Sequence, residues 1–420
     1  VLGREPDAAG SAYWVEQIAT GQASREAVAV SFLKSGESAS SPTASNALAN
    51  AYVLLRGAGL GDALTPALVD QARGATVAQL LSAKVGVVAD GYLSGATVWV
   101  DADNDGVKDP GERSVLTDTK GAYLSFGEAH PVVATGGTDI ATGLSFLGQL
   151  SAPAGALVVN PITTLVEKLT DRGLSVESAQ DYVARALSLN LAGTASLLST
   201  DWLASTNPSG FAAQTSAVQV ANLMRVSAAL VPAHQADELA DGIATALAAN
   251  ILSNLNRPLD LQSATLLTQV AGAGLTQAAQ SMSASDLAAL GQTLASLNSA
   301  VASQSAAALA SLNSGATTVS TAFESLAKLQ VIGQAFVGAE LAQALAAKRP
   351  LAEVAAKLDA SVLQALGAQV QAASGASGGL ALPSDKTPPT VASSDLVMKA
   401  AATGLVPSLA QLTVQFSEPV

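Results

Sequence analysis

The sequence of 420 residues contains no cysteine and only two histidines, His130 and His234. Without cysteine the chain can form no disulfide framework, no cysteine-ligated zinc or iron–sulfur site and no thiol nucleophile. Each histidine stands alone in the sequence, so an ordinary surface or packing role is expected for both. No metalloprotease, nucleophile-elbow or nucleotide-binding pattern occurs in a convincing context. We therefore expect no catalytic residues and no enzymatic activity.

Aromatic residues make up only 4% of the chain and charged residues only 13%, whereas about 25% charged residues are usual in globular domains. Hydrophobic residues make up 49%, so the cores must be built mainly from alanine, leucine and valine. The three tryptophans, Trp14, Trp99 and Trp202, lie in different segments. We expect them to anchor small cores, with stacking against sugars as the alternative.

Basic residues are also few: the chain has 20 lysines and arginines and 33 acidic residues, which gives a formal charge of -13. This balance argues against a nucleic-acid partner. Long apolar runs are missing as well: the apolar window 224–233 is interrupted by Arg225 and Pro232, so no membrane span is predicted. The start shows no initiator Met or signal-peptide pattern, and we expect the 420 residues to be an excerpt of a longer chain.

The pattern along the chain predicts a multidomain, mainly α protein. The predicted units are a helical domain (1–85), a small β module (86–155), an Ala-rich helical domain (156–373), a linker (374–390) and the first strands of a further module (391–420).

Local start signals support the helices. Thr65, Thr76, Asn160 and Ser283 are predicted N-caps, and proline follows Thr65 and Asn160 at the first helical position. An apolar stripe from Phe323 to Leu345 predicts a further helix before Pro350. In the β module, residues 96–100, 121–126 and 131–135 alternate as short strands do.

One segment has the residue types and the spacing of a metal-binding loop. Residues 101–112, DADNDGVKDPGE, match the twelve-residue calcium loop position for position. The matching positions supply carboxylates at places one, three, five, nine and twelve and a main-chain carbonyl at place seven: Asp101, Asp103, Asp105, Asp109, Glu112 and Val107. Gly106 allows the sharp turn. The sequence therefore predicts one bound Ca²⁺, because a cation would favour such a cluster of carboxylates.

A solvated acidic turn is the alternative for this segment. Strand patterns rather than helices flank it, so the ion would be structural; a calcium sensor would need a helix pair to open. Asp118, in the turn that follows, could add an oxygen ligand or simply initiate that turn, and we favour the turn.

Three segments resemble known families. Residues 1–37 look like a helical domain of unknown function with the core pattern LGRxPDxxGxxYW that recurs in large secreted RTX-type and surface-layer-associated bacterial proteins. The match is carried by Leu2, Gly3, Arg4, Pro6, Asp7, Gly10, Tyr13 and Trp14. Residues 91–126 resemble the calcium-binding β-sandwich B-repeats of serine–aspartate-repeat adhesins, through the loop 101–112 and the turn 117–123. Residues 385–420 look like the first two strands of a bacterial Ig-like repeat.

These resemblances imply a non-enzymatic, secreted structural protein of the bacterial cell surface that is stabilised by Ca²⁺. It would be a surface-layer lattice subunit or a segment of a large adhesin, and the composition does not separate the two. The partners expected are further copies of the chain in a self-assembled lattice, and a glycan or lipopolysaccharide of the cell surface. The alternative is a non-catalytic glycan-binding module of a secreted hydrolase or adhesin, with sugar contacts from Trp14 or Tyr13.

Overall fold

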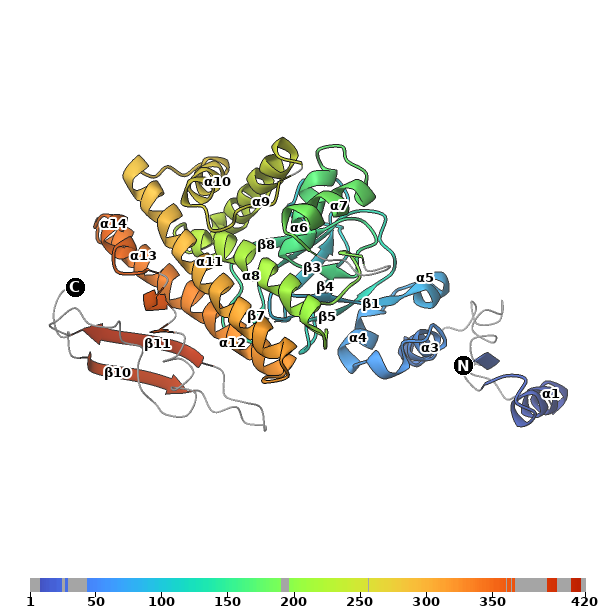
Figure 1. The fold of residues 1–420 in the computed structure, drawn as a ribbon. Coiled ribbons are helices and arrows are strands. Elements are labelled where there is room, and N and C mark those ends of the chain that lie inside the picture. The colour runs from blue at the N-terminus through green and yellow to red at the C-terminus, as the bar shows by residue number, and fades with distance from the viewer. Residues whose placement is uncertain are drawn as a thin grey trace.

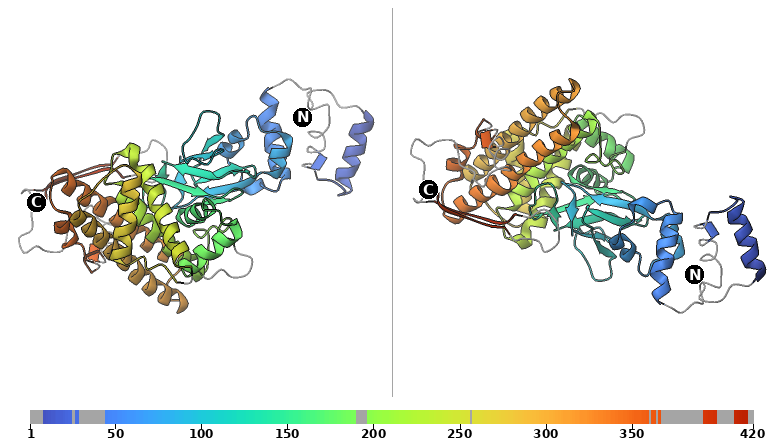
Figure 2. Two further views of the ribbon diagram at one scale, coloured as in Figure 1. Left: turned by 90° about the horizontal axis from the view of Figure 1, so that it is seen from above. Right: turned by 90° about the horizontal axis from the view of Figure 1, so that it is seen from below.

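The computed structural model describes residues 8–24, 27–28, 44–189, 196–255, 257–359, 361–363 and 365–366, and the backbone of 391–398 and 409–416. The protein is mainly helical, with about 55% helix and several small sheets. The N-terminal helices lie at one end, the sheets in the middle and the large helical body at the other end (Figures 1 and 2). The predicted linker at 374–390 lies outside the described residues.

Short helices precede the sheets: α1 (Ala8–Ala19), α3 (Ala44–Gly57), α4 (Pro66–Gln71) and α5 (Val77–Ser82). The predicted caps of the last two are confirmed. The Thr65 hydroxyl accepts a hydrogen bond from the Leu68 N–H, and Thr76 forms a reciprocal capping box with Gln79. A side-chain acceptor at the N-cap satisfies a backbone donor that a helix start leaves free, which explains why such short helices form here.

Nine short strands follow and form three sheets. Strands β5 (Ala122–Ser125), β1 (Lys84–Val88) and β9 (Val158–Val159) make a three-stranded sheet in that order. Strands β4 (Ser114–Leu116), β3 (Thr97–Val100), β6 (Val132–Thr135) and β8 (Gln149–Ala152) make an antiparallel four-stranded sheet. A small pair joins β2 (Leu93–Ser94) to β7 (Thr138–Asp139). The three strands predicted from alternation correspond to β3, β5 and β6.

The three-stranded sheet lies between two hydrophobic cores. Strand β5 shows this by its alternation: the Tyr123 side chain belongs to the large core, whereas Ala122 and Leu124 belong to the smaller one under α3, α4 and α5. Successive side chains of a strand point to opposite faces, so one strand can serve both cores. The large core runs without a break from the strands into the helices, from Val88 to Leu366.

The helical body begins with α6 (Pro161–Thr170) and α7 (Val176–Ala186) and continues with further helices. These are α8 (Pro208–Ala228), α9 (Ala236–Ser253), α10 (Ala264–Gln277), α11 (Ala284–Asn313), α12 (Val319–Val331), α13 (Gly338–Ala346) and α14 (Leu351–Ala355). The predicted caps Asn160 and Ser283 are confirmed at α6 and α11. The predicted stripe from Phe323 to Leu345 spans α12 and α13, which a π-helical turn at Ile332–Val337 connects.

Two further observations concern the chain as a whole. None of the described helices is long and apolar enough to cross a membrane. Near the C-terminus, β10 (Val391–Met398) and β11 (Leu409–Phe416) pair antiparallel, as the prediction of two strands required, whereas their assignment to an Ig-like domain stays a prediction.

Candidate metal site

The predicted calcium loop connects two paired strands. Strand β3 ends at Val100, the loop follows, and β4 returns antiparallel with Trp99 opposite Ser114. The prediction that strands rather than helices flank the loop is confirmed. The sheet therefore fixes both ends of the loop, whereas in a helix pair the flanking elements can move apart.

Three of the predicted ligands come together. One carboxylate oxygen each from Asp101, Asp103 and Asp105 lies within 4.8 Å of the other two. Asp101 is buried, with 2% of its surface exposed, while Asp103 and Asp105 are exposed. Hard oxygen donors of this kind suit Ca²⁺. The donor set therefore fits the predicted ion.

Backbone hydrogen bonds hold the cluster in place. The Asp101 carboxylate accepts from the N–H groups of Asp105 at 3.2 Å and Gly106 at 2.8 Å, and the Asp105 carboxylate accepts from the Val107 N–H at 2.7 Å. The chain reverses through left-handed conformations at Asn104 (φ 62°) and Gly106 (φ 76°), which asparagine and glycine tolerate best. The tight turn brings positions 101 and 105 together.

The other predicted ligands are placed differently. The carboxylates of Asp109 and Glu112 are not part of the three-residue cluster. Glu112 instead accepts from the N–H groups of Ala102 at 2.7 Å and Asp109 at 3.0 Å, so it closes the loop. The Val107 side chain is exposed, and its role through the main-chain carbonyl stays a prediction.

The two ends of the loop differ in electrostatics. Burial raises the pKa of the Asp101 carboxyl above its ordinary value, and the charge of Glu112 adds to this. The hydrogen bonds from Asp109 and Ala102 lower the pKa of Glu112. A buried carboxylate with a raised pKa gains from a neighbouring cation, because the cation offsets the cost of its burial.

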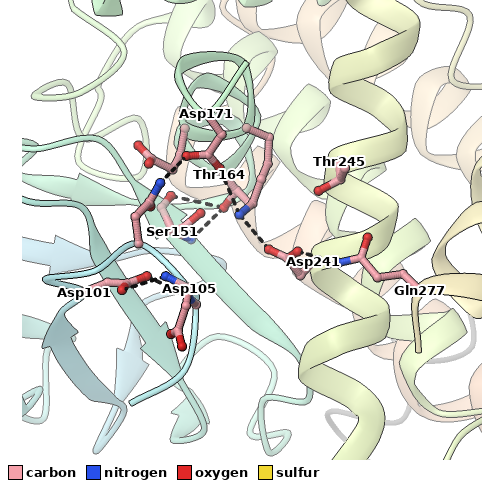
Figure 3. Close-up of polar contacts among 12 residues, drawn as sticks. Asp101, Asp105, Ser151, Thr164, Asp171, Asp241, Thr245 and Gln277 are labelled. Atoms are coloured by element: carbon pink, nitrogen blue, oxygen red, sulfur yellow. Dashed lines mark hydrogen bonds and ion pairs between the residues drawn. The ribbon is translucent and has the colours of Figure 1, made fainter. Parts of the chain in front are cut away.

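The loop is tied to the helical body. The Asn104 side-chain amide donates to Asp171 at the end of α6 at 2.8 Å, and Lys168 links Asp171 to Asp241 of α9 with distances of 3.4 and 2.7 Å. Asp241 in turn accepts from Gln277 of α10 at 2.9 Å. Figure 3 shows this path from the loop to α9. Hydrogen bonds and ion pairs therefore connect the loop to α6, α9 and α10.

The other residues that the sequence offered as possible ligands or sugar contacts lie in a turn, at the surface or in the core. The Asp118 carboxylate accepts from the N–H groups of Lys120 and Ala122, which confirms its role in the turn. His130 and His234 are both exposed. Trp99 and Trp202 are buried, as core anchors should be. Tyr13 is 53% exposed and stands edge-to-face against Trp14, so sugar contact by this pair stays a prediction.

Sequence reasoning missed a buried charge cluster, which we name the Asp90 cluster: Asp90, Asp139 and Arg225. Arg225 of α8 forms an ion pair with Asp90 at 2.6 Å and lies 4.0 Å from Asp139. Their exposed fractions are 1%, 0% and 5% for Asp90, Asp139 and Arg225. The signal in the sequence was Arg225 itself, an isolated charge within an apolar helical window, because such a charge needs a buried partner.

Comparison with known proteins adds one match. A family model described as "Domain of unknown function (DUF4214)" matches residues 1–41. That match covers the N-terminal segment alone, and its description names no activity. No curated protein matches the chain, and no solved structure does.

Proposed function

We propose that the protein is a non-enzymatic structural protein of the bacterial cell surface in which the loop 101–112 binds one Ca²⁺. The observation that carries this proposal is the convergence of Asp101, Asp103 and Asp105 within 4.8 Å in a loop between paired strands. These three carboxylates would hold the ion. The main-chain carbonyl of Val107 and the side chains of Asp109 and Glu112 complete the proposed ligand set.

The bound ion would stabilise the connection between sheet and helices. Three carboxylates so close together repel one another, and a divalent cation removes this repulsion. Since Asn104 donates to Asp171 of α6, a rigid loop also holds the end of that helix. Calcium would thus replace the covalent links that a cysteine-free chain lacks.

The surface location rests on composition and resemblance. A loop of this type in extracellular modules binds with dissociation constants of about 10⁻⁴–10⁻³ M, which suits millimolar calcium outside cells. The acidic, cysteine-free composition and the three family resemblances agree with a secreted surface-layer subunit or adhesin. Further copies of the chain and a cell-surface glycan or lipopolysaccharide remain the proposed partners.

Thermal unfolding with and without calcium tests whether the loop binds the ion. In calcium at ten times the dissociation constant, the native state should gain about 1.4 kcal/mol, measured as a higher melting temperature than in EDTA. Asp105→Ala should remove this gain, because it deletes one of the three clustered carboxylates. Asp181→Ala is the matched control, since Asp181 is exposed on α7 far from the loop in sequence.

Equal melting temperatures and equal proteolytic resistance in EDTA and in millimolar calcium would contradict the calcium proposal. The lattice has a separate test on native cells. Electron microscopy should show two-dimensional arrays that a chelator dissolves, if the protein is a lattice subunit. Cell surfaces without such arrays would instead favour the adhesin segment.

A further inference from the structure

A second site is formed by a cavity of about 640 Å³ between the β strands and the helices. Its walls come from five places: Gly91 and Tyr92 before β2, Ala141 after β7, the loop 203–206, Gln214 of α8, and the face of α12 from Val319 to Gln330. Ligand pockets for small molecules have volumes of about 300–1,000 Å³ and usually lie between structural units. The size and the position of this cavity fit that description.

Two buried glutamines give the cavity fixed hydrogen-bond acceptors. The Gln214 Nε2 donates to the Asp90 carbonyl at 2.8 Å, and the Gln330 Nε2 donates to the Asp90 carboxylate at 3.2 Å. The two side chains are 2% and 3% exposed. With each amide nitrogen held by Asp90, the Oε1 atoms remain as acceptors at the cavity, and no described residue donates to either.

Tyr92 presents an aromatic ring at the cavity in a strained conformation. Its backbone is left-handed, with φ 56°, which is uncommon for a bulky residue. Its hydroxyl donates to Asp201 at 2.6 Å and so fixes the ring. Backbone strain of this kind is often found at ligand sites. Phe323 of α12 supplies a second ring, which packs edge-to-face on Phe211.

The negative charges around the cavity disfavour anionic ligands. Glu324 is the one charged lining residue, and beneath the floor the Asp90 cluster holds two carboxylates against one guanidinium. An anion such as a phosphate or carboxylate would be repelled. Hydroxyls of Ser205, Thr206 and Ser320 also line the walls. Acceptors, hydroxyls and aromatic faces together suit an uncharged ligand with many hydroxyls and one apolar face.

We propose that this cavity binds a neutral sugar, as a free monosaccharide or as the end of a glycan. Its hydroxyls would donate to the two glutamine Oε1 atoms, and its apolar face would pack on Tyr92 or Phe323. The site is separate from the calcium loop and from Tyr13 and Trp14. The success or failure of this proposal therefore leaves the calcium proposal unchanged.

Ligand-observed NMR tests the proposal on the full chain in millimolar calcium. The probes are D-glucose, D-galactose, D-mannose and N-acetyl-D-glucosamine at millimolar concentrations, with ethanolamine as a cationic probe. We expect saturable binding of at least one sugar, observed as transfer of magnetisation from the protein to that sugar. Ala327→Trp should raise its dissociation constant at least about tenfold by filling the cavity. Ser320→Trp fills the same cavity from the start of α12. It replaces Ala327→Trp in the test if that variant does not fold.

Thr321→Trp is the control, because Thr321 is exposed on α12 and is not a lining residue. Binding in this control should equal that of the parent chain. Three results would overturn the proposal: no saturable binding of any sugar, sugar binding that the folded cavity-filling variants retain, or binding of ethanolamine without binding of a sugar.

Discussion

Asp139 carries a fully buried carboxylate beside the carboxylate of Asp90, with one arginine between two acids. Its Oδ1 accepts from the Ala141 N–H at 2.8 Å, whereas its Oδ2 has no hydrogen-bond partner among the described residues. Burial, and then the charge of Asp90, raise the pKa of Asp139 from 3.8 to about 6. The charged form is therefore costly in the folded protein.

Asp139→Asn should stabilise the protein at neutral pH. Because the folded pKa is raised, the folded state binds the proton more tightly, and stability is lost as the pH rises from about 4 to about 6. At pH 7 the loss approaches about 3 kcal/mol by linkage, of which we expect Asn to recover about 1–2 kcal/mol. Urea unfolding at pH 4 and pH 7.5 measures this, and the two chains should differ little at pH 4.

The control for Asp139→Asn is Asp70→Asn, since Asp70 is 61% exposed and pairs only with Arg73 among the described residues. This change should leave the pH dependence as it was. An Asp139→Asn chain that is less stable than the parent at pH 7.5 would show that the charge of Asp139 is needed by Arg225.

Gly91→Ala should destabilise the same region. A Cβ at residue 91 would lie 2.9 Å from Asp139 Cγ and 3.0 Å from Ala141 Cβ, closer than ordinary contact. Overpacking in a dense core costs about 1–3 kcal/mol, and chemical denaturation should show a loss in this range. Gly61→Ala is the control, because its nearest neighbour, the end of the Arg56 side chain, is 4.0 Å away.

At the scale of single elements, the start of α6 depends on one buried cap. The Asn160 Oδ1 accepts from the Thr163 N–H at 2.8 Å, and the Thr163 hydroxyl accepts from the Asn160 N–H at 2.8 Å. Thr163 and Thr164 also bond to Ser151 of β8, which joins the helix to the four-stranded sheet. The cap therefore positions α6 against that sheet.

Asn160→Ala should cost about 2 kcal/mol of stability, at the upper end for a cap, because the freed N–H of Thr163 is buried. Ser175→Ala at the exposed start of α7 is the matched control, and it should cost about 0.5–1 kcal/mol. Guanidinium unfolding of both variants measures the difference. Equal losses would show that burial adds nothing to the Asn160 cap.

The caps were predictable because their information is local. Thr65, Thr76, Asn160 and Ser283 each stand three residues before the N–H that they accept from, so a few sequence letters contain the whole interaction. The calcium loop is local for the same reason. Strand β9 was not predictable, because its two residues pair with β1 from about 70 positions away.

At the scale of the whole molecule, the Asp90 cluster shows what local patterns leave out. Arg225 reaches Asp90 across 135 positions, and Gln330 reaches it across 240. Nothing within a helical turn of Arg225 reveals these partners. Tertiary packing decides which buried charges meet, so sequence reasoning could identify Arg225 as unusual within its apolar window but not its partners.

The shared core predicts that sheet and helices unfold together. Core residues run continuously from Val88 of β1 to the helices, and the Asp90 cluster joins the two parts in the interior. Opening that contact would expose an ion pair and apolar surface at once, which favours a single cooperative transition over two. Tryptophan fluorescence can follow each part separately, since Trp99 lies in β3 and Trp202 precedes α8.

Two variants with one tryptophan each test this. Trp14→Phe/Trp202→Phe leaves Trp99 to report on the sheet, and Trp14→Phe/Trp99→Phe leaves Trp202 to report on the helical body. Helical circular dichroism on each variant corrects for any change that the substitution makes in stability. The fluorescence and dichroism midpoints should coincide within each variant, because coincident transitions by different probes indicate two-state unfolding. A Trp99 midpoint that precedes the dichroism midpoint of the same variant would show that the sheet unfolds before the helices.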